Sequence, residues 1–231
     1  MTAQTESIAL APDGLAARFL APEMAAILAA HAAPPTDQID EMRANALASK
    51  AVFNERAKAN LAVRAIEVPG ADGVLTGLCV GETPGKVPVV HIHGGGWAAG
   101  SPSTHLSLLA GLHRATGRTV FAPHPRQAPE HPFPAPLRDT VAAIRSLARG
   151  ASAPIHLSGD SAGAHLALAA VLAARDDGAP LPLASLTLMY GCYRKRFDTT
   201  SHTTFGDGTA GLSTERMRLF WEWFSPDGAA D

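Results

Sequence analysis

One five-residue stretch, Gly159-Asp160-Ser161-Ala162-Gly163, has the spacing G-x-S-x-G of a nucleophile turn. In this pattern the serine lies on a tight, strained turn between a strand and a helix, which lifts its hydroxyl above the sheet. Side chains two positions before and after the serine would collide with the neighbouring strand or helix, which explains Gly159 and Gly163. The helix that follows points its positive dipole end, and the amide of Ala162, to where an oxyanion would form.

The context of this pattern decides between a reactive serine and an ordinary turn. The segment "APIHLSG" before the serine is typical of a buried strand, and "SAGAHLALAAVLAAR" after it is typical of a helix. Since a G-x-S-x-G without such flanks often marks a plain turn, these flanks favour a nucleophile at Ser161.

A second stretch, "VVHIHGGGWAAG" at residues 89–100, allows two chemistries. His91 and His93 alternate along a predicted strand, so they share one face and could begin a metal site of the amidohydrolase type. Such a metal barrel needs further ligands from later strands and eight strand-helix units, which this chain does not supply. We therefore expect His91 to be packed in a strand, His93 to brace the glycine turn, and the glycines to expose backbone amides to a negatively charged oxygen.

The elements that must position these residues alternate between strands and helices from residue 63 onward. Such alternation predicts right-handed crossovers and a mostly parallel sheet covered by helices on both faces, and the opening hairpin adds an antiparallel edge. The predicted strands cover residues 63–70, 73–82, 86–93, 118–123, 153–159 and 183–191, and the predicted helices cover 104–117, 137–150, 161–175 and 214–225.

The N-terminal part has a helical pattern instead. Residues 22–33 predict one helix, which Pro34 and Pro35 end, and a second helix starts near Thr36 or Asp37. We expect residues 1–62 to form a helical segment packed over the sheet, and residues 63–231 to form the α/β core.

Composition narrows the class of partner. The net charge of −2, from 19 basic and 21 acidic residues, has no basic stripe, which argues against nucleic acid and anionic membranes as partners. The N-terminus lacks an export pattern and no apolar run approaches 18 residues, so we expect a cytoplasmic protein with a small-molecule substrate.

Cys79 and Cys192 each lie in an apolar stretch and are expected to be buried thiols. No feature indicates an oligomeric state.

Three motifs in this order, "HGGGW", "APEHPFPAPLRD" and "GDSAGAHLAL", resemble the hormone-sensitive-lipase-like family of α/β-hydrolase carboxylesterases. The similarity extends over roughly residues 20–225, because the two N-terminal helices resemble the helical cap of that family. The resemblance implies the α/β-hydrolase fold and hydrolysis of short-chain acyl esters without a cofactor or metal.

The resemblance also implies roles for single residues. Ser161 would be the nucleophile, and the amides of Gly95, Gly96 and Ala162 would form the oxyanion hole, supported by His93, Gly94 and Asp160 of the two motifs. Glu130 would brace the nucleophile region, and the helices near residues 22–60 would wall the acyl pocket. The chain departs from the family pattern D-Y-R-L-A-P-E-H at Pro125 and Gln127, and has Ala164 where a glycine often follows S-A-G.

The acid and the histidine of a catalytic triad are expected after Ser161, on loops that follow later strands. His165 lies on the nucleophile's own helix, which favours a structural role, and Asp198 with His202 leaves no strand between acid and base. We therefore expect a C-terminally truncated esterase that lacks its triad acid and histidine, its last strands and its last helix. The alternative is a non-catalytic pseudo-hydrolase that binds ligands.

The C-terminal aromatic residues point in the same direction. Phe220, Trp221, Trp223 and Phe224 form too much aromatic surface to remain exposed, and we expect their cover to be missing from this chain. An uncovered sheet edge together with these side chains predicts aggregation of the chain when it is expressed alone.

Overall fold

The computed structural model describes residues 36–59, 61–83, 86–208 and 211–228. The chain divides into two compact units, a larger one formed by residues 35–195 and 220–231 and a smaller one formed by residues 1–34 and 196–219. The first predicted N-terminal helix, residues 22–33, lies outside the described residues. The boundary predicted at residue 62 stays a prediction.

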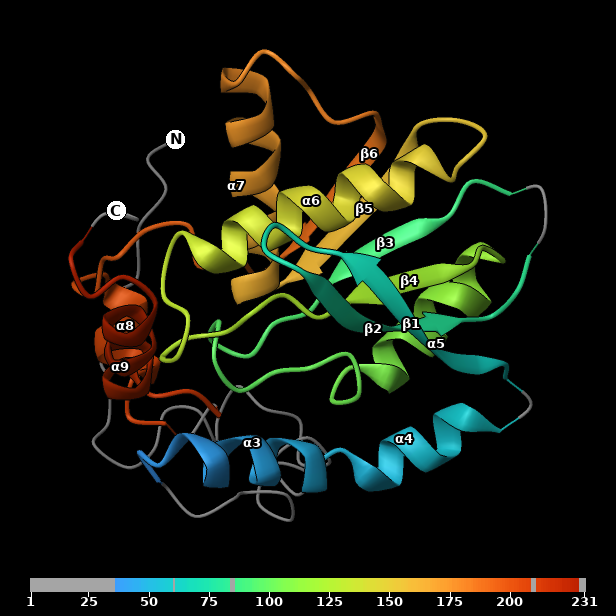
Figure 1. The fold of residues 1–231 in the computed structure, drawn as a ribbon. Helices are drawn as coiled ribbons and strands as arrows, with labels where there is room; N and C mark the ends of the chain where they lie inside the picture. Colours follow the sequence, from blue (N-terminus) through green and yellow to red (C-terminus); the bar gives the residue numbers. More distant parts are fainter. Residues whose placement is uncertain (1–35, 60, 84–85, 209–210, 229–231) are drawn as a thin grey trace, which may run out of the picture. The chain divides into compact units, whose positions relative to one another are not determined.

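The larger unit is built around a six-stranded sheet with the order β1-β2-β4-β3-β5-β6 (Figure 1). β1 pairs antiparallel with β2 and β2 with β4, while β3 pairs parallel with β4 and β5, and β5 parallel with β6. The predicted hairpin and parallel core are both confirmed. The strands are β1 (Val63–Pro69), β2 (Val74–Val80), β3 (Val89–Ile92), β4 (Val120–Pro123), β5 (Ile155–Asp160) and β6 (Leu183–Met189).

Helices cover both faces of this sheet. α6 (Ala135–Arg149) packs on β1, β3 and β4, and α7 (Ala162–Asp176) packs beside it on β3, β5 and β6. α5 (Leu106–Thr116) packs on β2 and β4, and α4 (Ala51–Lys58) packs on α5. Two core clusters separate the faces, because β2 contributes Leu78 and Val80 to the cluster under α5 but Leu75 to the cluster under α6.

The predicted second N-terminal helix is two helices, α3 (Ile39–Ala48) and α4, which run along one side of the unit (Figure 1). The break falls at Ser49 and Lys50, where Ser49 donates a hydrogen bond from its hydroxyl to the Ala46 carbonyl. A serine that bonds back to the preceding turn competes with the helix hydrogen bonds and favours such a bend.

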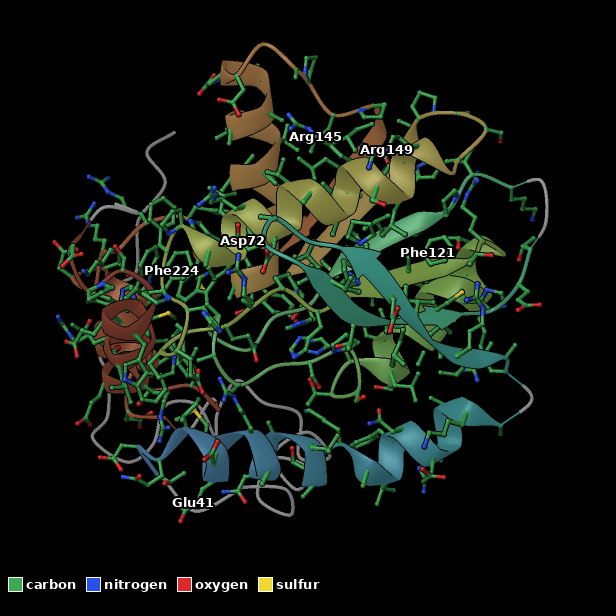
Figure 2. All side chains as sticks on the ribbon, viewed as in Figure 1. Glu41, Asp72, Phe121, Arg145, Arg149 and Phe224 are labelled. Carbon is green, nitrogen blue, oxygen red and sulfur yellow. The ribbon has the colours of Figure 1, made fainter. Side chains whose placement is uncertain are left out.

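α6 is fixed to the rest of the unit by a buried carboxylate. Asp139 is fully buried and accepts four hydrogen bonds, from the amides of Ala71 and Arg126 and from Nε and Nη2 of the Arg126 guanidinium. Arg126 also bonds Asp72, which is labelled in Figure 2, at 2.8 Å. Burial raises the pKa of Asp139, but the Arg126 hydrogen bonds outweigh it and hold that pKa below its usual value.

The described part of the smaller unit consists of residues 196–208 and 211–219. It holds α8 (Thr200–Phe205) and the first part of α9 (Thr214–Phe224), and the Phe197 ring contacts the His202 ring and the Arg218 guanidinium. Across the described residues of both units, no helix has the length and hydropathy needed to cross a membrane.

Candidate active site

Ser161 is the junction between β5 and α7. Its backbone has φ 50° and ψ −123°, a region that non-glycine residues rarely occupy and that costs about 1–3 kcal/mol. The Ser161 amide donates to the Met189 carbonyl at 2.9 Å, and the Ser161 carbonyl accepts from His165 at 3.2 Å. The predicted strained turn is therefore present, and its backbone groups are bonded on both sides.

The two glycines that flank the serine have no room for a side chain. A Cβ on Gly159 would lie 2.6 Å from the Gly163 carbonyl oxygen. A Cβ on Gly163 would lie 2.1 Å and 2.5 Å from the carbonyl oxygens of Ile92 and His93, at the end of β3. The collision predicted from the spacing is confirmed at both positions.

The glycine loop after β3 turns back on itself beside Ser161. Gly95 (φ 110°) and Gly96 (φ 62°) have left-handed backbones, and the Gly95 carbonyl accepts from the amides of Ala98 and Ala99. A Cβ on Gly94 would lie 3.1 Å from the Ser161 Cβ, so this backbone runs directly against the nucleophile turn.

Three backbone amides around this turn are free to donate. In the described part of the chain no hydrogen bond occupies the N–H groups of Gly95, Gly96 or Ala162. The Ala162 amide is the first of α7 and has no partner within the helix. Free donors from a loop and from a helix N-terminus are the arrangement that stabilises a developing negative charge on oxygen.

His93 braces the glycine loop from behind. Because a carbonyl only accepts, His93 Nδ1–H donates to the Gly94 carbonyl at 2.9 Å, and Nε2 accepts from His124 Nδ1–H at 2.9 Å. Burial lowers the pKa of His93 well below its usual value and lowers the pKa of His124 to about 4. Both rings are therefore neutral at pH 7.

Asp160 is a buried carboxylate that joins four segments. Its Oδ1 accepts from the Gly94 amide at 3.0 Å and from His91 Nε2 at 3.2 Å, while Oδ2 lies 3.1 Å from the Tyr190 hydroxyl and 3.4 Å from His105 Nε2. Burial raises the pKa of Asp160, but the hydrogen bonds from His105 and His91 outweigh it and hold that pKa well below its usual range. The sequence patterns indicated neither His105 nor Tyr190.

Ser158, His91 and Asp160 form a hydrogen-bonded Ser-His-Asp chain of their own. His91 Nδ1 lies 2.8 Å from Ser158 Oγ, but all three side chains are at most 5% exposed. Without solvent access this chain cannot meet a substrate, so it is a packing network. His91 is packed in its strand as expected, and the described residues contain no group of three or more side chains placed to hold a metal ion.

Three of the four aromatic C-terminal residues, Phe220, Trp221 and Phe224, are buried within the chain, so the prediction that their cover is missing was wrong for these three, while Trp223 is half-buried. Phe224 stacks on the Trp97 ring at 4.5 Å and is fully buried; Figure 2 labels it. Trp221 contacts the same ring and is 1% exposed, while Phe220 lies against Gly96. The glycine loop itself is the cover that the sequence did not reveal.

His165 belongs to this aromatic cluster. Its Nδ1 accepts from Trp97 Nε1 at 3.2 Å, and its ring packs edge-on against Trp97 and Phe224. Burial lowers the pKa of His165 to about 4. The structural role expected for His165 is confirmed.

Glu130 reaches the glycine loop through an arginine of α3. Its carboxylate accepts two hydrogen bonds from Arg43, at 2.7 Å and 2.8 Å, and Arg43 Nε donates to the Ala98 carbonyl. The hydrogen bond from Arg43 lowers the pKa of Glu130 to about 2. Gln127, which departs from the family pattern, donates to the Gly100 carbonyl at 2.9 Å. Glu130 therefore holds α3 to the loop.

The Ser161 hydroxyl lies next to a thiol. Ser161 Oγ lies 3.8 Å from Cys192 Sγ, and burial raises the pKa of that thiol. Cys192 is half-buried, whereas Cys79 is buried as expected, and both are free thiols.

Asp198 and His202 are engaged separately within the smaller unit. The Asp198 carboxylate pairs with the Arg196 guanidinium, and His202 Nδ1 shares a hydrogen bond with the Thr199 hydroxyl at 2.7 Å. The ring nitrogen that a triad acid would orient is thus taken by a hydroxyl. The two residues do not form the acid-base pair of a triad here.

Comparison with known proteins gives consistent matches. A family model described as alpha/beta hydrolase fold matches residues 89–231. An acetyl-hydrolase of Streptomyces hygroscopicus is 44% identical over 52% of this chain and 43% of its own length, and an acetyl esterase of Salmonella choleraesuis is 30% identical over 81% and 60%. The chain thus spans about half the length of the curated relatives that it matches.

Among solved structures, a hyperthermophilic esterase from the archaeon Pyrobaculum calidifontis superposes with a TM-score of 0.79 at 26% identity. The match covers 89% of this chain and 70% of that one.

Proposed function

This chain belongs to the alpha/beta hydrolase fold family, as its motifs predicted, and from that membership we propose that it is a serine carboxylesterase that acts on short-chain acyl esters. The relatives described as acetyl-hydrolase and acetyl esterase support a small acyl group. One observation carries the proposal: a serine held on a strained turn lies against a glycine loop, and three backbone amides of that loop and of the following helix N-terminus have no hydrogen-bond partner among the described residues. A cytoplasmic location stays a prediction of the sequence.

In the proposed reaction, Ser161 Oγ attacks the ester carbonyl carbon and loses its proton to a base. The carbonyl oxygen becomes an oxyanion, which accepts hydrogen bonds from the amides of Gly95, Gly96 and Ala162. When the oxyanion collapses, the bond to the alcohol oxygen breaks, the alcohol leaves with a proton, and the acyl group stays on Ser161. Water then attacks the acyl-enzyme and releases the carboxylic acid.

The base that takes the proton from Ser161, and the acid that orients this base, are the next question. The histidines near this site in the described part of the larger unit have other partners. His91 bonds Ser158 and Asp160, His93 bonds Gly94 and His124, and His165 bonds Trp97. His105 Nε2 faces Asp160 Oδ2, and its Nδ1 lies 3.0 Å from the Ser101 carbonyl oxygen. We therefore propose that this chain lacks the triad acid and histidine, and that it forms and releases the acyl-enzyme slowly.

Stoichiometric acylation tests this proposal. The chain is incubated with p-nitrophenyl acetate, and peptide mass spectrometry locates the acetyl group. We expect the acetyl group on Ser161, with turnover no more than about 10³–10⁴ over the uncatalysed rate, because binding and oxyanion donors alone supply that much. Ser161→Ala should lose the modification, while Ser158→Ala should retain it, since Ser158 is buried and 4% exposed.

Two outcomes would change the interpretation. Fast turnover that both Ser161→Ala and His202→Ala abolish would show that His202 completes a triad. Equal modification of the wild-type chain and Ser161→Ala would refute the esterase and favour the non-catalytic pseudo-hydrolase.

A further inference from the structure

Tyr190 has an unusual conformation for an exposed aromatic residue. It follows β6 directly, and its backbone is left-handed with φ 39°. Tyr190 is 75% exposed, more than any other large hydrophobic residue among the described residues. A left-handed non-glycine residue costs free energy and persists where the surrounding structure fixes it. The exposed ring gains little from packing, so a polar contact must hold it.

That contact is the hydrogen bond from the Tyr190 hydroxyl to Asp160 Oδ2, at 3.1 Å. Asp160 is 4% exposed, so the ring lies at the surface while its hydroxyl reaches a buried charge. The preceding residue is also tied to the nucleophile turn, because the Met189 carbonyl accepts from the Ser161 amide. The end of β6 is thus joined to Asp160 and Ser161 at once.

The two oxygens of Asp160 have different tasks. Oδ1 accepts from the Gly94 amide and from His91, which places the glycine loop. Oδ2 has the Tyr190 hydroxyl and His105 Nε2, and the His105 distance of 3.4 Å is longer than a strong charge-assisted bond. The tyrosine is therefore the closer of the two groups that hold Oδ2, and it limits rotation of the carboxylate about its Cβ–Cγ bond.

We propose that Tyr190 is a positioning residue: by fixing the Asp160 carboxylate, its hydroxyl holds the Gly94 amide, and with it the Gly95 and Gly96 amides, in place beside Ser161. This inference rests on the proposed oxyanion role of those amides. It assigns a function to a residue that lies 29 positions after the nucleophile and outside every recognised motif.

A tyrosine titration tests the bond itself. The chain has only two tyrosines, so the Tyr193→Phe variant leaves Tyr190 as the single phenol that absorbs near 295 nm on ionisation. Burial, the charge of Asp160 and its hydrogen bond raise the pKa of Tyr190 to about 12. At pH 10.5 about 3% of Tyr190 should therefore be ionised, against about 76% for a phenol of ordinary pKa.

The same titration in the Asp160→Asn variant separates the effect of the Asp160 carboxylate on the pKa of Tyr190 from the effect of burial. Removing the carboxylate charge leaves only burial to raise the pKa, so the ionised fraction at pH 10.5 should increase at least about threefold. An ionised fraction near three quarters in Tyr193→Phe, or no change on adding Asp160→Asn, would overturn the proposal.

Backbone NMR tests the positioning. In Tyr190→Phe, the amide signals of Gly94, Gly95 and Gly96 should shift, because the carboxylate that receives the Gly94 N–H is no longer fixed. Tyr193→Phe, which removes the hydroxyl of the neighbouring exposed tyrosine, is the matched control and should leave these signals in place. Unchanged glycine signals in Tyr190→Phe would refute the positioning role.

Neither the titration nor the NMR experiment needs an acylated Ser161, so failure of the positioning role can be distinguished from failure of the esterase proposal. Where acetylation of Ser161 is observed, its rate should fall at least about tenfold in Tyr190→Phe, because small displacements of oxyanion donors are costly, and should not change in Tyr193→Phe. Equal acetylation rates in the two variants would overturn the inference.

Discussion

Replacing Gly163 by alanine should destabilise the protein strongly, whereas the same change at Gly111 should stabilise it. Both glycines lie in helices with ordinary backbones, Gly163 in α7 and Gly111 in α5, so alanine has the better helix propensity at both positions. The two sites differ in the space around the new methyl group, which makes them a matched pair.

The magnitude follows from the distances. At Gly163 the new Cβ would lie 2.1 Å from the Ile92 carbonyl oxygen, and ordinary contact begins near 3.4 Å, so the end of β3 and the start of α7 must separate by about 1.3 Å. Overpacking against backbone costs about 3 kcal/mol, at the upper end of the usual range. At Gly111 no described atom outside the backbone of its own helix lies within 4 Å of the new Cβ, and alanine should stabilise the fold by about 0.5–1 kcal/mol.

Tryptophan fluorescence measures both changes, with urea unfolding for the free energy of unfolding and thermal unfolding for the Tm. For a domain of this size we expect the Tm to fall by roughly 6–12 °C in Gly163→Ala and to rise by roughly 1–4 °C in Gly111→Ala. A Gly163→Ala protein whose free energy of unfolding lies within about 0.5 kcal/mol of the wild type would refute the close approach of β3 to the nucleophile turn.

Three further predictions concern the supports of the site. Asp139→Asn should lower the free energy of unfolding by about 3–5 kcal/mol, and Asp72→Asn should lower it by under about 1 kcal/mol. Both carboxylates bond Arg126, but only Asp139 is fully buried, so equal losses measured by denaturant titration would contradict this prediction. His165 has a folded-state pKa of about 4, so its neutral form is favoured, and roughly 3 kcal/mol of stability present above pH 6.5 is lost as the pH falls to 4. His165→Gln should therefore flatten the loss measured by urea midpoints at pH 7 and 4.5, and an unchanged slope would count against the assignment. Phe224→Ala should lower the free energy of unfolding by about 3–5 kcal/mol, and the same change at the half-buried Trp223 should lower it by roughly 1 kcal/mol. Similar thermal stabilities of the two variants would mean that Phe224 is not packed as described.

The sequence predicted the parts of the structure that depend on local chemistry. The strands β1 to β6 and the helices α5, α6, α7 and α9 followed from hydrophobic periodicity, and the β1-β2 hairpin followed from its turn residues, whereas α8 lies in a stretch where no helix was predicted. The crowding at Gly159 and Gly163 followed from the strained turn at Ser161. Each of these features is set by residues within one or two elements.

The missed features depend on contacts between distant parts of the chain. Tyr190 meets Asp160 across 30 positions, and His105 meets it across 55, without any motif that joins them. Periodicity did not predict the cover of Trp221 and Phe224, because their partner, Trp97, lies more than 120 positions earlier in the chain. Periodicity indicates that a side chain is buried, but it does not say against what.

The position of Asp160 raises an electrostatic question for the proposed oxyanion site, because a buried negative charge next to a developing oxyanion should oppose it. Four groups bond or face that carboxylate, and the Gly94 amide is one of them. The amides of Gly95, Gly96 and Ala162 have no partner among the described residues and remain available for the oxyanion. Removing the charge with Asp160→Asn therefore has two opposite effects: it relieves repulsion of the oxyanion, and it releases the glycine loop. If repulsion dominated, Asp160→Asn would acetylate Ser161 faster than the wild type. We expect slower acetylation, because a buried charge bonded by several donors is largely compensated in place, whereas a misplacement of about 1 Å in the reacting geometry can cost about a hundredfold in rate.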